Sequence, residues 1–122
     1  MSHIVTVQSE LRDHAAVAAA CRRLVLPEPV QGTAQLCSGQ ASGLLVHLPD
    51  WLYPVVIDTN SGTTRYDNFG GSWGDEQHFH RLLQAYTVER TRIEARKKSY
   101  VTTEQALGDG SILVEIEVGG QA

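Results

Sequence analysis

The sequence has few cysteines and no long apolar run. Its two cysteines, Cys21 and Cys37, lack the paired spacing of a zinc site or a disulfide framework. No stretch approaches the ~18 apolar residues of a membrane-spanning helix, and the N-terminal residues have no basic segment of the kind that starts a signal peptide. These absences exclude a disulfide-stapled domain and a membrane-spanning helix, and we expect a cytoplasmic protein.

The chain also lacks a strong excess of one charge. Its 122 residues include 10 Lys and Arg against 14 Asp and Glu, for a net charge of −4, and 42% of the residues are hydrophobic. Nucleic-acid-binding domains are usually more basic, with a pI above about 9. The composition and length therefore predict one globular domain over residues 1–122 without a general affinity for phosphate.

The pattern of apolar and polar residues predicts five strands within the first 68 residues. These strands cover residues 3–8, 33–38, 44–48, 52–58 and 63–68. Gly39 and Gly43 bound the second and third strands. Pro54 lacks a ladder donor, which suggests either a sheet edge or the beginning of the fourth strand.

Helical spacing predicts two helices. The first is capped by Asp13, ends before Pro27 and turns Cys21 toward the core, where a free thiol is a small apolar filler. The second begins at the acidic pair Asp75 and Glu76 and has one apolar stripe. That stripe comprises Phe79, Leu82, Leu83, Tyr86 and Ile93.

The end of the chain predicts a β-hairpin. A two-residue type I′ turn at Asp109-Gly110 would place Leu107 opposite Ile112 and Val101 opposite Val118. In that register the apolar residues of the last strand point to the core; they are Ile112, Val114, Ile116 and Val118. The order of elements predicts an α+β fold with two helices on one face of a mostly antiparallel sheet, ferredoxin-like and elaborated with extra hairpin strands.

Four segments of the chain are similar to a known family. They are Met1-Ser2-His3, YDNFGGSWGD at 66–75, LLQAYTVERTRIEARKKSY at 82–100 and DGSILVEI at 109–116. The chain resembles the conserved-reading-frame family of algal plastids and cyanobacteria, which also occurs in other bacteria and is classified as a domain of unknown function. The resemblance covers nearly the whole chain and is loosest at 27–50. It departs at Ile4 and Ser99, where many relatives have an aromatic residue and a glycine.

That resemblance implies no catalytic residues, because the family has none established. Its genes often lie beside those of an AAA-type ATPase and of another small protein. The resemblance therefore implies a partner-binding role, with an AAA-type ATPase as the leading partner.

An aromatic, glycine-rich loop is the main candidate site. Six of the eight aromatic residues fall within residues 51–79, and Tyr and Trp are frequent at interface hot spots. We predict a partner-binding surface at this loop, formed by Trp51, Tyr66, Phe69, Gly70, Gly71 and Trp73. The glycines also permit a tight connection in which Trp73 plugs the junction of sheet and helix, which would make the loop purely structural.

The same loop offers an alternative as a ligand site or an enzyme. Asp67, Asp75 and His78 could converge there, although strand-end aspartates more often cap turns. The loop lacks the lysine of a phosphate-binding loop, and its helix begins with carboxylates that would repel an anion. His78 and His80 diverge on a helix, and a site from His3, Asp75 and His78 has no supporting spacing, so we predict no metal and no cofactor. We favour a non-enzymatic protein over this alternative.

A second alternative is nucleic-acid binding through the basic end of the second helix. Four cations gather there, namely Arg92, Arg96, Lys97 and Lys98. Glutamates interleave with them and few aromatic residues accompany them, which favours a solvated face or an acidic protein partner. Our prediction is a non-enzymatic accessory or adaptor protein that binds a partner protein; the sequence leaves the oligomeric state open.

Overall fold

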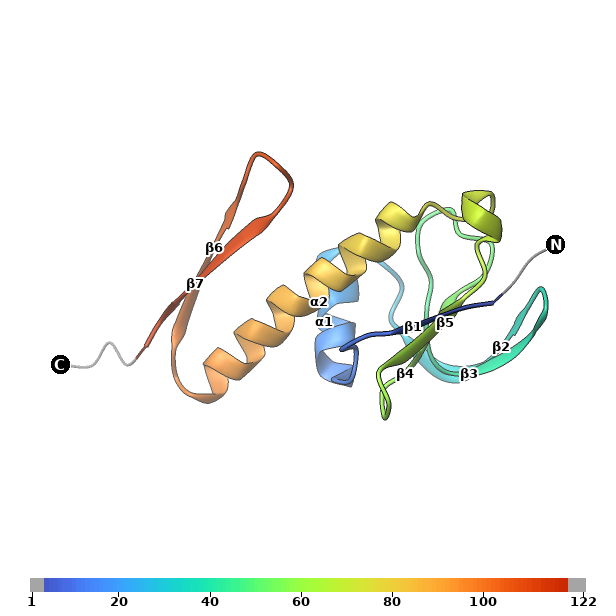
Figure 1. The fold of residues 1–122 in the computed structure, drawn as a ribbon. Helices are drawn as coiled ribbons and strands as arrows, with labels where there is room; N and C mark the ends of the chain where they lie inside the picture. Colours follow the sequence, from blue (N-terminus) through green and yellow to red (C-terminus); the bar gives the residue numbers. More distant parts are fainter. Residues whose placement is uncertain (1–3, 119–122) are drawn as a thin grey trace.

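The chain forms a five-stranded antiparallel sheet, two helices and a separate two-stranded hairpin (Figure 1). The computed structural model describes residues 4–118, so His3 and its metal prediction lie outside the described residues. The elements in chain order are β1 (Val5–Gln8), α1 (His14–Arg23), β2 (Val30–Leu36), β3 (Gly39–Val46), β4 (Val55–Asp58), β5 (Thr63–Tyr66), the 3₁₀ turn η1 (Phe69–Gly71), α2 (Glu76–Lys97), β6 (Val101–Ala106) and β7 (Ile112–Glu117). The predicted α+β class is confirmed.

The five-stranded sheet has the order β1-β5-β4-β3-β2, with every neighbouring pair antiparallel. Pro54 directly precedes β4, which is the central strand, so of its two interpretations the strand's beginning is correct. The prediction of one sheet was wrong, because β6 and β7 pair only with each other among the described strands. A ferredoxin-like arrangement is not confirmed.

The boundaries of β2 and β3 differ from the predicted ones. The turn between them lies at Cys37 and Ser38, and Gly43 lies inside β3 rather than before a strand. The reason is a close backbone approach, because a Cβ atom on Gly43 would lie 2.5 Å from the carbonyl oxygen of Ile57 on β4. Glycine therefore marks strand contact here and not a strand end.

Both helices cover the same face of the five-stranded sheet. Leu44 and Ile57 of the sheet join Val17 and Cys21 of α1 and Leu82 of α2 in one buried cluster. The predicted stripe of α2 is confirmed, with Phe79, Leu82 and Tyr86 buried and Leu83 and Ile93 packed at the border. Burial raises the pKa of the Cys21 thiol to about 11, as expected of a core filler.

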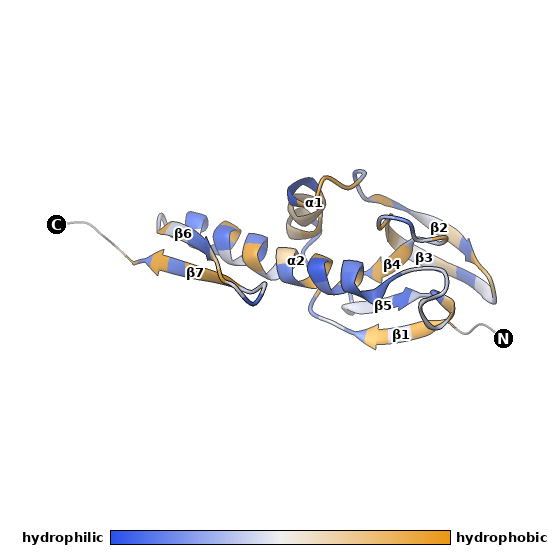
Figure 2. Cartoon of the chain, turned by 90° about the horizontal axis from the view of Figure 1, so that it is seen from above, coloured by the Kyte–Doolittle hydropathy of each residue, from blue (hydrophilic) through white to orange (hydrophobic). Residues whose placement is uncertain are grey.

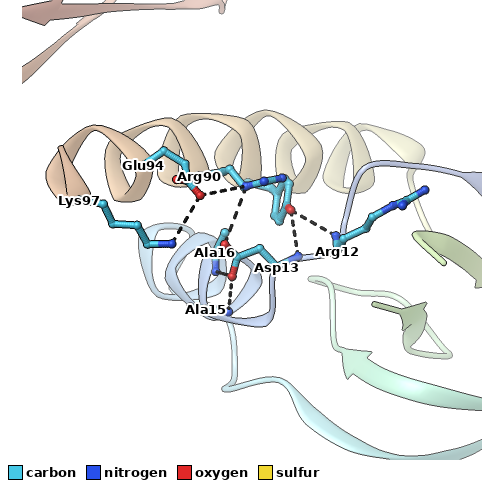
Figure 3. Close-up of polar contacts among 8 residues, drawn as sticks. Arg12, Asp13, Ala15, Ala16, Arg90, Glu94 and Lys97 are labelled. Atoms are coloured by element: carbon cyan, nitrogen blue, oxygen red, sulfur yellow. Dashed lines mark hydrogen bonds and ion pairs between the residues drawn. The ribbon is translucent and has the colours of Figure 1, made fainter. Parts of the chain in front are cut away.

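Polar contacts fix the beginning of α1 against α2. The Asp13 carboxylate caps α1 by accepting hydrogen bonds from the backbone N–H groups of Ala15 and Ala16 (Figure 3). The buried Tyr86 hydroxyl on α2 accepts from the backbone N–H groups of Arg12 and Asp13, at 3.2 and 3.1 Å. Two backbone donors of the chain entering α1 are thus satisfied by the other helix.

A smaller apolar cluster lies on the opposite face of the sheet. Its buried members are Ala34, Leu36, Ala41 and Val56. Ile4, Leu45 and Tyr53 pack against it, and Gly39 lies near enough to Ile4 that a Cβ atom there would be 3.6 Å from Ile4 Cδ1. The tip of the β2–β3 hairpin therefore curls toward the chain entering β1.

The C-terminal hairpin has a different register from the predicted one. Ile112 pairs with Ala106 and Glu117 with Val101, one residue away from the predicted pairing. Gly110 has a φ of 90° and donates to the Leu107 carbonyl, and the Leu107 N–H donates to Ser111, which describes a three-residue loop with a glycine bulge. Asp109 stabilises that longer loop by accepting hydrogen bonds from the N–H and hydroxyl of Ser111.

The prediction that β7 turns its apolar residues into the core was also wrong. Ile112 and Val114 are half-buried, whereas Ile116 and Val118 remain exposed. The hairpin extends from the end of α2 that lies away from the five-stranded sheet (Figures 1 and 2). Within the described chain α2 is the main element packed against the hairpin, so β7 keeps much of its apolar surface in solvent.

Candidate partner-binding surface at the aromatic loop

Asn68 organises the loop between β5 and α2. Its backbone carbonyl accepts hydrogen bonds from Gly71 and Trp73, and its buried side-chain amide donates to the Gly74 carbonyl at 3.1 Å. The Trp73 carbonyl in turn accepts from the N–H of Leu52, which ties the loop to the chain before β4. These bonds hold the loop in one shape before any partner binds.

Three aromatic rings form an outer cluster on this loop, which we define as Tyr53, Phe69 and Trp73. The Phe69 and Trp73 rings stack with centroids 4.6 Å apart, and Tyr53 meets Trp73 edge-on at 5.7 Å. Phe69 is 40% exposed, and the neighbouring Leu52 is 61% exposed. The outer cluster and Leu52 together present apolar surface to solvent.

Trp51 and Tyr66 form an inner pair beneath the loop. Their rings meet edge-on with centroids 5.3 Å apart, and the Trp51 indole N–H donates to the Asp75 carbonyl. Tyr66 is buried in the main core, and burial raises the pKa of its hydroxyl. A Cβ atom on Gly74 would overlap the Trp51 ring. Of the six predicted surface residues, Tyr66 therefore lies in the core and Trp51 is half-buried against Gly74.

Gly70 and Gly71 lie at the exposed tip of the loop. Their φ angles are 60° and 104°, in the left-handed region that favours glycine, and no atom lies within 4 Å of a Cβ built on either residue. Phe69 also has a positive φ, of 48°, which is unusual for an aromatic residue. The two glycines are thus required by backbone conformation and not by contact.

A buried carboxylate lies at the end of β5. Asp67 is fully buried, and neither of its carboxylate oxygens accepts a hydrogen bond from residues 4–118. Burial, the Cys37 thiol and the Asp67 carboxylate raise the pKa of the Tyr53 hydroxyl. Asp67 is therefore close to the outer cluster but is not accessible from solvent.

The alternative ligand site does not come together as the spacing suggested. Asp75 is exposed and caps α2 through a hydrogen bond from the Gln77 N–H. His78 lines a pocket of about 140 Å³ with Leu24, Leu48 and other residues, and neither Asp67 nor Asp75 is among them. Within residues 4–118, no three His, Cys, Asp or Glu side chains gather as metal ligands.

The basic end of α2 divides between two grooves. Arg92 and Arg96 line one of about 720 Å³ with arginines of α1, whereas Lys98 lines another of about 360 Å³. Two of the four predicted cations contact carboxylates, Arg92 with Glu104 at 2.6 Å and Lys97 with Glu94 at 3.5 Å. The four cations therefore do not form one continuous patch for a phosphate backbone.

The sequence-based prediction missed two members of the exposed surface. Tyr53 and Leu52 precede β4 and are brought beside the loop by the hydrogen bond from Leu52 to Trp73. Their position within the aromatic-rich stretch 51–79 was the available signal. The contact itself joins residues about twenty positions apart and could not be inferred from local pattern.

The chain shows no significant match to protein-family models, to curated proteins or to solved structures. Of the helices in the described part of the chain, none combines the length and apolar character that a membrane crossing requires.

Proposed function

We propose that the protein is a cytoplasmic accessory or adaptor protein that binds a partner protein through the aromatic loop. The main support for this proposal is the stacked pair of Phe69 and Trp73. The pair is held on a hydrogen-bonded loop, and Leu52 is exposed beside it. Rigid aromatic anchors supply binding area at little entropic cost, and preformed loops avoid the penalty of ordering on association. The AAA-type ATPase implied by the resemblance is the first partner to test.

The acidic residues around the loop indicate which charge the partner's surface should carry. Asp50, Asp75 and Glu76 are exposed next to the loop and its flanking segments. We therefore expect the partner to offer an apolar pocket for Phe69 with basic residues at its rim. A rim of that sign would speed association more than it would strengthen the complex.

The test is the affinity of purified AAA-type ATPase for Phe69→Ala and Leu52→Ala, measured by isothermal titration calorimetry. We expect Phe69→Ala to weaken binding about thirtyfold, as removal of a hot-spot aromatic residue does, and Leu52→Ala to weaken it less. Both side chains are exposed, so the far-ultraviolet circular dichroism spectrum should not change.

Val25→Ala is the matched control, because Val25 is 89% exposed and lies after α1 rather than at the loop. The proposal fails if Val25→Ala weakens binding as much as Phe69→Ala does. It also fails if Phe69→Ala binds the ATPase with unchanged affinity. If the wild-type protein does not bind the ATPase, wild type and Phe69→Ala should be compared as baits in pull-downs from host lysate. Equal recovery of every captured protein by the two baits would contradict the proposed surface.

A further inference from the structure

The outer edge of β7 is an unpaired strand beside an apolar groove. Within the described chain β7 pairs only with β6, so its other edge leaves backbone N–H and C=O groups without strand partners. The groove has a volume of about 360 Å³ and is lined by residues of α2 together with Tyr100, Ile116 and Val118. Ile116 is 43% and Val118 67% exposed. An edge of this kind is a template for another strand.

Strand β6 differs from β7 because its Glu104 side chain is held in ion pairs. Glu104 of β6 accepts hydrogen bonds from Arg23 and Arg92, both at 2.6 Å. Those arginines pull the pKa of the Glu104 carboxyl below its ordinary value. The strand is also polar in sequence, with two threonines, a glutamate and a glutamine in six residues. Strand addition is therefore directed to β7.

The sequence of β7 is self-complementary in one antiparallel register. If a two-fold axis passes through Val114, Val114 meets its own copy and Ile112 lies opposite Ile116 of the other copy. Leu113 then lies opposite Glu115, so like charges never face each other directly. A register centred on Glu115 would oppose two glutamates, and one centred on Ile116 would oppose Glu115 to Glu117.

Charge at the ends of this register agrees with it. The two-fold axis through Val114 brings Gly110 of one copy opposite Val118 of the other, and Asp109 therefore lies at the end of the groove. The groove carries two cations, Arg90 and Lys98, against one carboxylate, Glu94. Asp109 of each copy would therefore meet a groove with an excess of positive charge, once at each end of the joined strands.

We propose that two copies of this chain pair along β7 about a two-fold axis through Val114, giving a four-stranded antiparallel sheet of order β6-β7-β7-β6. The contact would cover Ile112, Val114 and Ile116 of both copies and place them over the groove. Because the same surface meets itself, the assembly closes as a dimer and does not grow further. This proposal is independent of the aromatic loop, which lies at the other end of α2.

Disulfide trapping of Val114→Cys tests the register directly. Directly opposite residues of antiparallel strands have Cα atoms about 4.5–5.5 Å apart, within the range a disulfide spans. In a Cys37→Ser background, Cys21 is buried and the new thiol is the reactive one. We expect mild oxidation to join most Val114→Cys chains into covalent dimers at micromolar concentration.

Thr103→Cys in the same background is the control, because Thr103 lies on β6 of the same hairpin and is more exposed than Val114. Random collision would cross-link Thr103→Cys more readily, whereas the proposed register requires the reverse order. Circular dichroism of both variants before oxidation checks that each has folded. Equal or stronger cross-linking of Thr103→Cys would overturn the proposal.

Sedimentation equilibrium supplies a second measurement without new cysteines. The wild-type protein should sediment at twice the 13.4 kDa of one chain, and Ile116→Lys at the mass of one chain. An inward-pointing lysine blocks strand addition and costs the isolated hairpin little, since Ile116 is already partly exposed. A wild-type monomer at hundreds of micromolar, or an open series of larger species, contradicts the closed dimer.

Discussion

The five-stranded sheet and the C-terminal hairpin are both antiparallel, but they differ in what covers them. Leu44, Val55 and Ile57 of the sheet have no exposed surface, because α1 and α2 pack over them. Val101 of the hairpin is 58% exposed, and Ile116 and Val118 are exposed on the neighbouring strand or just after it. Figure 2 shows the difference as hydrophobic segments of β7 that lie beside the end of α2, at a distance from the five-stranded sheet.

The comparison teaches that strand pattern and burial are separate properties. The last four residues of β7 alternate apolar side chains with glutamates, whereas β4 reads VVID without alternation, yet β4 is the strand that is buried beneath the two helices. The hairpin is attached mainly through the end of α2 and the ion pairs of Glu104. We therefore expect the core to be sensitive to apolar truncation and the hairpin to respond more to its polar contacts.

Leucine truncation should separate the two regions most strongly. Leu44→Ala removes a fully buried side chain beneath both helices and should lower the free energy of unfolding by about 2–5 kcal/mol. Leu107→Ala removes a side chain that is 41% exposed in the hairpin loop and should change it by less than about 0.5 kcal/mol. Urea denaturation of both variants measures the difference. Equal losses would show that the hairpin belongs to the same core.

Much of the fold was predictable from the sequence because local chemistry determined it. Asp13 caps α1 as predicted, and the apolar stripe of α2 is buried where its spacing placed it. The hairpin register was not predictable, because Asp109-Gly110 suits both a two-residue turn and the three-residue loop with a bulge at Gly110. One residue of slippage in the pairing decides which residues of β6 face those of β7.

Most residues of the candidate site could be predicted from the sequence, but which of them are buried and which are exposed could not. The local pattern indicated an aromatic loop, yet it could not separate Tyr66, which is buried in the core, from Phe69, which is exposed. That separation depends on how the Trp51 ring packs on Gly74 and against the Tyr66 ring. Contacts between distant segments also explain why Asp67 is buried rather than available to a ligand.

Two hydrogen bonds to the buried Tyr86 hydroxyl provide the next comparison. Tyr86→Phe keeps the ring but leaves the backbone N–H groups of Arg12 and Asp13 without their acceptor. Unsatisfied donors of this kind cost about 1–3 kcal/mol, so we expect a loss in that range by urea denaturation. Tyr100→Phe, at the start of the hairpin, removes the same atom from a half-buried residue and should be nearly neutral. A neutral Tyr86→Phe would mean that water replaces the hydroxyl.

Glu104→Gln tests the polar attachment of the hairpin and should have the smallest effect. Hydrogen bonds and charge from Arg23 and Arg92 lower the pKa of Glu104 from its ordinary value, so the ionised form stabilises the folded state. That stabilisation is complete above the ordinary glutamate pKa and is lost as the pH falls through the lowered value. At pH 7 we expect the free energy of unfolding of Glu104→Gln to be about 1 kcal/mol below that of wild type, and no more than that because the ion pairs are partly exposed.

As the pH is lowered past the Glu104 pKa, the free energies of unfolding of the two proteins should converge. Glu115→Gln, on the exposed far face of the same hairpin, should be as stable as wild type at pH 7. Urea denaturation across that pH range measures the convergence, and hydrogen exchange of the β6 amides shows whether the loss is local to the hairpin. A difference that persists in acid would mean that the amide itself disturbs the packing, and the hairpin would then be attached by shape rather than by charge.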